Sequence, residues 1–164
     1  LECFQHTGTF KARGAMSVSS SISHENQKYG FTAASAGNHA IAAAWAARKL
    51  GTSAKVIMRS TANPYRIARV KEEKAEIKIV DDVKELFEEA EKLVKEEKRT
   101  FIHPFEGINT TLGTAGVGIE FIEEVPNLDL VIVSVGGGGL ISGVASSIKF
   151  INSIRNFHIW DCIF

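Results

Sequence analysis

Short apolar runs alternate along this chain with longer stretches in which apolar residues recur every three or four positions. The short runs are typical of buried strands, and the longer stretches are typical of amphipathic helices. The runs predict strands at residues 30–34, 54–59, 76–80, 100–102 and 130–135. The stretches predict helices that begin near residue 10 and that cover 38–50, 113–124 and 140–152. This alternation predicts an α/β fold with a mainly parallel sheet.

Local signals add two further helices between these strands. Asn63 followed by Pro64 is typical of a helix start, with asparagine as the N-cap and proline in the first helical position. Asp81 or Asp82 is expected to cap the next helix. Its apolar residues keep a spacing of three or four: Val83, Leu86, Phe87, Ala90, Leu93 and Val94. We interpret the charged residues between them as a solvated face.

Composition and charge narrow the class of protein. The 164 residues suffice for one domain or two small lobes, and 19 basic residues balance 19 acidic ones. We therefore expect no nucleic-acid partner and, without an apolar run of about 18 residues, no membrane partner. Cys3 and Cys162 form neither a disulfide framework nor a CxxC motif, which fits a reducing, cytoplasmic location. Because the chain does not begin with Met, an upstream targeting segment is the alternative that we keep open.

A run of glycines joins the predicted strand 130–135 to the last predicted helix. At such a junction the backbone N–H groups and the helix dipole favour an anion, and glycines let the backbone approach it closely. The run lacks the Gly-Lys-Ser/Thr of a P-loop, and Ile141 or Ser142 stands where GxGxxG requires its last glycine. A tight turn without a ligand is the alternative, although successive glycines are entropically costly. We expect a phosphate at Gly136, Gly137, Gly138 and Gly139.

Residues 35–40, Ser-Ala-Gly-Asn-His-Ala, form a second strand-to-helix junction. Hydroxyl and amide side chains lie there beside free backbone N–H groups, an arrangement that fits a carboxylate. An ordinary N-cap formed by Ser35 or Asn38 is the alternative. His39, in the first turn, is more typical of a packing or capping residue than of a catalytic one.

Lys11 lies in the sequence Thr-Gly-Thr-Phe-Lys at residues 7–11. If a helix begins near Phe10, the amine stands at the end of the dipole that disfavours a cation. We expect the pKa of the amine to be lowered there, which favours the neutral nucleophile that Schiff-base chemistry needs. An isolated lysine is more typical of a solvated surface, so the two anion-binding junctions give Lys11 its weight.

Taken together, these motifs resemble the pyridoxal-phosphate-dependent threonine/serine dehydratase family, which includes serine racemase and has the tryptophan synthase β-like fold (fold type II). The resemblance rests on residues 1–15, 35–40 and 136–140, which occur in the family's order. It implies a small parallel α/β lobe, residues 30–108, inserted in a larger and here truncated α/β cofactor lobe, residues 1–29 and 109–164. The active site is expected between the lobes. Since the apolar tail 156–164 ends without a turn, we expect part of a longer parent, which is expected to be a homo-oligomer.

The resemblance also implies a role for each matching residue. Lys11 matches the lysine that binds pyridoxal 5'-phosphate covalently. Further cofactor contacts are implied for Phe10, Asn38, Gly136, Gly137, Gly138, Gly139 and Leu140. Contacts with the substrate carboxylate are implied for Ser35, Ala36, Gly37, Asn38 and His39. We expect no metal ligand among these residues.

The implied reaction is β-elimination of L-threonine or L-serine, which releases a 2-oxo acid and ammonia. The substrate amine displaces Lys11, and the freed lysine amine takes the Cα proton as general base. Serine racemases carry a serine, acting as a second acid/base, where this chain has Ala36. Alanine has no proton to exchange, so we favour a dehydratase over a racemase. A cysteine synthase-like β-replacement enzyme is a further alternative, as is a truncated chain that binds a ligand or partner without turnover.

Overall fold

The computed structural model describes residues 1–151 and 160–161. In chain order its elements are η1 (Glu2–Phe4), α1 (Lys11–Ser21), α2 (His24–Gln27), β1 (Phe31–Ala34), α3 (Asn38–Lys49), β2 (Ala54–Arg59), α4 (Pro64–Glu72), β3 (Glu76–Val80), α5 (Val83–Glu97), β4 (Thr100–Phe101), α6 (Ile108–Glu124), β5 (Ser134–Val135), α7 (Gly139–Ile151) and β6 (Trp160–Asp161). Both expected helix caps are present. The side chains of Asn63 and Asp82 accept backbone N–H groups at the starts of α4 and α5.

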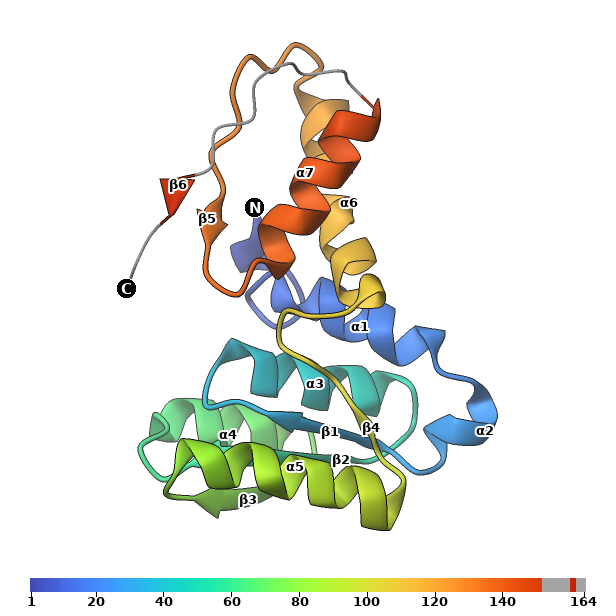
Figure 1. Ribbon diagram of the computed structural model, residues 1–164, viewed down its shortest axis with the longest axis vertical. Helices are drawn as coiled ribbons and strands as arrows, with labels where there is room; N and C mark the ends of the chain where they lie inside the picture. Colours follow the sequence, from blue (N-terminus) through green and yellow to red (C-terminus); the bar gives the residue numbers. More distant parts are fainter. Residues whose placement is uncertain (152–159, 162–164) are drawn as a thin grey trace.

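A parallel sheet of four strands, in the order β3-β2-β1-β4, forms one end of the molecule (Figure 1). The pairing of β1 with β2 begins at Phe31 opposite Ala54, and β3 and β4 add to the outer edges. All these pairings are parallel, which confirms the α/β prediction. Because β1 and β4 are parallel neighbours, the segments that follow them leave the same edge of the sheet.

The strands send alternate side chains into two cores. On one face Ala33 and Val56 pack beneath α3 and α4. On the other face Ala34 and Ile57 pack against α5 through Leu86 and other apolar residues. The six apolar residues predicted to line one face of α5 are therefore only partly buried. Three of them remain substantially exposed: Val83, Phe87 and Val94.

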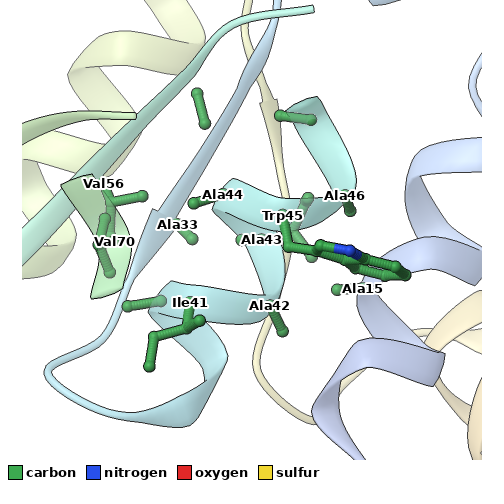
Figure 2. Packing of buried hydrophobic residues seen from close by; sticks show 14 of the residues in the cluster. Ala15, Ala33, Ile41, Ala42, Ala43, Ala44, Trp45, Ala46, Val56 and Val70 are labelled. Carbon is green, nitrogen blue, oxygen red and sulfur yellow. The ribbon is translucent and has the colours of Figure 1, made fainter. Parts of the chain in front are cut away.

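Helix α3 is buried along almost its whole length. Its alanines from residue 40 to 47 all lie in the core, together with Ile41 and Trp45. A helix that is apolar on all sides needs neighbours on all sides. Figure 2 shows the Trp45 ring beside Ala15 of α1, while Ala33 and Val56 lie toward the sheet. Helix α3 thus joins the sheet to the helical layer, and this contact sets the place of α1 over the sheet.

Helices α6 and α7 cross at very short range beyond α1 (Figure 1). A Cβ built on Gly143 would overlap the Thr114 hydroxyl and lie 2.6 Å from the Ala115 nitrogen. Likewise, a Cβ on Gly118 would lie 2.7 Å from the Val144 carbonyl oxygen. The absence of side chains at these glycines therefore allows the two backbones to meet.

Two predictions for the last third of the chain were wrong. The helix expected from residue 113 begins at Ile108, because tertiary packing overrides the modest helix propensity of the preceding threonines. Thr110 is buried there, and a Cβ on Gly14 of α1 would lie 3.2 Å from its Cγ2 atom.

The buried strand expected at residues 130–135 is paired only at Ser134 and Val135, where it meets β6. Within the described residues no neighbour forms a ladder with 130–133, so that segment is not a strand. It is also covered on one side only. Leu130 and Ile132 are 47% and 68% exposed, whereas Val131 and Val133 pack with α7. Apart from β6, the tail 156–164 lies outside the described residues.

None of the helices in residues 1–151 has both the length and the apolar character needed to cross a membrane.

Candidate active site

A small pocket lies where the first turns of α1, α3 and α7 meet α6 and the segment after β4. It is lined by Phe10, Lys11, Gly14, Ala15, His39, His103, Pro104, Thr110, Thr114, Gly139 and Leu140. Three stretches that are distant in sequence, and that were each predicted to carry chemistry, thus contribute to one pocket.

The structure brings some of the predicted residues into this wall and leaves others beside it. The lining includes Phe10, Lys11, His39, Gly139 and Leu140. The wall does not include Ser35, Ala36, Gly37, Asn38, Gly136, Gly137 or Gly138. These residues immediately precede His39 and Gly139 in the chain, so they flank the pocket on the α3 and α7 sides.

Lys11 is the first residue of α1 and is partly buried. Its Nζ atom donates a hydrogen bond to the carbonyl oxygen of Pro104 (2.5 Å) and lies 5.1 Å from the centre of the Phe10 ring. Burial lowers the pKa of the Lys11 amine below its ordinary value. The direction is the one expected from its place at a helix start, but the cause is desolvation. Lys11 therefore carries an amine that gives up its proton more readily than a surface lysine.

The glycine loop enters α7 through Gly138, whose φ of 84° is a conformation that favours glycine. The backbone N–H and the hydroxyl of Ser142 both donate to the Gly138 carbonyl, and the Thr114 hydroxyl donates to the Gly139 carbonyl. The first N–H groups of α7 have no acceptor within the helix. A Cβ on Gly136 or Gly138 would point into open space. This side of the loop therefore leaves room for an anion.

Gly137 and Gly139 are glycines for another reason. A Cβ on Gly137 would overlap the ring of Phe105, and one on Gly139 would lie 2.6 Å from the Phe105 carbonyl oxygen. The segment after β4 therefore packs directly on the glycine loop.

The junction at residues 35–39 has no side chain capping α3. Its N-cap is Gly37, and the Ser35 hydroxyl accepts the Gly37 N–H (3.1 Å). Asn38 is exposed at the first position of the helix. The ordinary N-cap by Ser35 or Asn38 is thus not formed. The Ala40 N–H donates to the Gly37 carbonyl, and the N–H groups of Asn38 and His39 stay available to an anion.

The His39 side chain is buried and faces the sheet rather than solvent. Its Nε2 atom lies 2.8 Å from the Ile102 carbonyl oxygen, so Nε2 carries the proton and donates. The pKa of His39 is lowered to about 4, mainly by burial and also by the positive charge of Lys11. His39 is therefore neutral at pH 7, and its side chain fastens α3 to the end of β4.

We expect this buried histidine to make stability depend on pH. An unfolded histidine titrates near about 6.5, so between there and pH 4 the unfolded chain binds a proton that the native chain does not. The free energy of unfolding should fall as pH falls through this window, by about 3 kcal/mol in all, and then level off. Urea unfolding of the wild type and of His39→Gln across this window measures the effect. Equal pH dependence in the two proteins would contradict it.

Sequence reasoning missed the part of the pocket that follows β4 and the part from α6. The predicted strand 100–102 stops just before His103 and Pro104, and no part of a site was predicted at Thr110 or Thr114. The Thr110 hydroxyl is buried without a hydrogen-bond partner among the described residues. A usable signal existed for His103, since it directly follows a strand expected to share a parallel sheet with β1, and the ends of such strands meet.

Residues 1–160 match the family described as "Pyridoxal-phosphate dependent enzyme". The chain is 44% identical over 151 residues to a phenylserine dehydratase of Ralstonia pickettii, an alignment that covers 92% of this chain and 46% of that protein. It is 37% identical over 153 residues to an L-threonine ammonia-lyase of Thermotoga maritima, covering 93% and 38%. The structure of maize serine racemase matches with a TM-score of 0.93 at 34% identity, covering 97% and 49%. This chain thus spans about half the length of these relatives, or less.

Proposed function

Because this chain belongs to the family of pyridoxal-phosphate dependent enzymes, we propose that the protein eliminates ammonia from L-threonine or L-serine and releases a 2-oxo acid. The observation that carries the proposal is the position of Lys11. Its amine, with a lowered pKa, shares one pocket wall with the start of α7 at Gly139. A reactive amine and a helix start that suits a phosphate are the two features that this cofactor requires.

The residues around the pocket supply the chemical groups that the cofactor needs. An aldehyde needs the Lys11 amine, and a phosphate needs free N–H groups such as those after Gly138. The unpaired hydroxyl of Thr110 adds a buried polar group on the same wall. The cavity itself is about 10 Å³, room for roughly one water molecule. Binding therefore requires side chains of the pocket wall, Lys11 among them, to move aside.

The chain's own groups divide the work of the elimination. When bound, pyridoxal phosphate supplies the electron sink that stabilises negative charge at the substrate Cα. The N–H groups after Gly138 would hold its phosphate, and the first-turn N–H groups of α3 after Gly37 would hold the substrate carboxylate. The Lys11 amine, once free, takes the Cα proton as general base. Burial assists this step, because it favours the neutral amine.

Ala36 favours elimination over racemisation. Inversion at Cα requires a second acid/base on the face of the cofactor opposite the lysine. The serine racemases that this chain resembles provide it with a serine at this position. The dehydratase and ammonia-lyase relatives support the same choice, since their names describe eliminations. The likeness to maize serine racemase keeps racemisation as the second candidate.

A product assay separates these candidates. The chain is incubated with pyridoxal phosphate and, separately, with L-threonine and L-serine, and both 2-oxo acid and D-serine are measured. The proposal expects 2-oxobutanoate from threonine or pyruvate from serine, and no D-serine. D-serine without pyruvate would show that Ala36 is not the deciding position and that the protein is a racemase.

A further inference from the structure

The imidazole of His103 closes a tight turn immediately after β4. Its Nδ1 atom accepts two backbone N–H groups, from Glu106 (2.8 Å) and from Phe105 (3.4 Å). An atom that accepts two N–H groups carries no proton of its own, so the neutral ring is protonated at Nε2. The tautomer is therefore set by the turn.

The ring is held in this position by its neighbours. Phe101 and Phe105 contact it edge to face, with ring centres 5.8 Å and 4.6 Å away. Its Nε2 atom lies 3.7 Å from a carboxylate oxygen of Glu106. Such a clamped ring acts as a fixed acceptor rather than as a mobile surface histidine.

A single peptide bond of the turn, between Pro104 and Phe105, connects the His103 ring to Lys11. The carbonyl of Pro104 and the N–H of Phe105 belong to the same planar trans peptide, so they point in opposite directions. The N–H points to His103, and the carbonyl on the other side accepts the Lys11 amine. The same turn places Phe105 against Gly137 and Gly139.

We propose that His103 is a positioning residue for Lys11, holding the Pro104–Phe105 peptide so that its carbonyl orients the lysine amine beside the glycine loop. The importance of Lys11 rests on the proposed function, whereas the geometry is independent of it. Protonation of Nδ1 would remove both accepted hydrogen bonds. The charged or titratable groups that act on this ring are Glu106, Lys11 and His39. Burial, aided by Lys11, keeps the pKa of His103 below its ordinary value, against the opposing effect of Glu106.

Competitive acetylation of amines in the cofactor-free chain tests the proposal. Trace acetic anhydride labels each lysine, and peptide mass spectrometry gives the rate for Lys11 relative to the exposed Lys28. Asparagine places an oxygen near the position of Nδ1, whereas glutamine places it near Nε2. In His103→Asn we expect Lys11 to be acetylated at the wild-type rate. In His103→Gln we expect it to be acetylated about fivefold faster, because one ordinary hydrogen bond of the amine is lost.

Two results would overturn the proposal: no change in either variant, or the same change in both. Long-range ¹H–¹⁵N correlation spectra of the wild type give a second test that no folding defect can obscure. An Nδ1-protonated His103 in those spectra also overturns it. A failure of the wild-type chain to bind pyridoxal phosphate at Lys11 would instead contradict the proposed function and leave these outcomes unaffected.

Discussion

Replacing Lys11 with alanine should lower 2-oxo acid formation by about 10³-fold or more, because loss of a general base alone costs roughly 10²–10⁴-fold. The same substitution removes the covalent attachment point of the cofactor. Lys11→Arg should be equally inactive, since a guanidinium stays charged and forms no Schiff base. Initial rates with L-threonine and L-serine at saturating pyridoxal phosphate measure the effect.

Lys28 provides the matched control for this prediction. Its ammonium lies 5.0 Å from the centre of the Tyr29 ring, much as Lys11 lies over Phe10, but the residue is exposed and is not part of the pocket lining. Lys28→Ala should keep the wild-type rate. Activity of Lys11→Ala within tenfold of that control would show that another group performs the chemistry.

The Gly143→Ala substitution should destabilise the protein by about 3 kcal/mol, at the upper end of the cost of overpacking. The new methyl group would overlap the Thr114 hydroxyl and lie 2.6 Å from the backbone atoms Ala115 N and Thr111 O. Backbone atoms cannot swing aside, so α6 and α7 must separate. Helix propensity alone would make the alanine variant more stable by about 1 kcal/mol. A loss of stability would therefore indicate the close contact between the helices.

Gly116→Ala is the control for this packing argument. Gly116 lies within α6, and the atom nearest to its Cβ position is the Arg13 guanidinium Nη1, 3.0 Å away. This is a side-chain atom, held by Glu120 (2.7 Å), and no backbone atom of a neighbouring element lies close by. We expect this variant to unfold at nearly the wild-type urea concentration. If Gly143→Ala is as stable as Gly116→Ala, the close crossing of α6 and α7 is not what the structure indicates.

Local chemistry made most of the sheet predictable. Strands β2 and β3 have the predicted bounds. Gly51 and the cap at Asn63 bracket β2, and the cap at Asp82 starts the helix that follows β3. Helix α3 was predictable because alanine, its most frequent residue, has the highest helix propensity. The start of α6 was not predictable, since residues 108–112 are helical through contact with α1 rather than through their own propensity.

The site was predictable where the residue type itself indicates the backbone geometry. The glycine loop and the first turns at Lys11 and His39 were found because glycines and helix starts have a direct physical meaning. The roles of His103 and Pro104 depend on how a turn faces a lysine more than ninety residues away, and no local pattern encodes that contact. The same limit explains the error at residues 130–133, because strand pairing depends on partners that lie elsewhere.

Borohydride reduction of the chain with pyridoxal phosphate, followed by peptide mapping, identifies the lysine that carries the cofactor. We propose that this lysine is Lys11. Among the described residues, it is the one lysine that has a lowered pKa and also lines the pocket. We expect one phosphopyridoxyl group, on the peptide that contains Lys11, and none on that peptide in Lys11→Ala. Labelling spread over exposed lysines, or absent from Lys11, would contradict it.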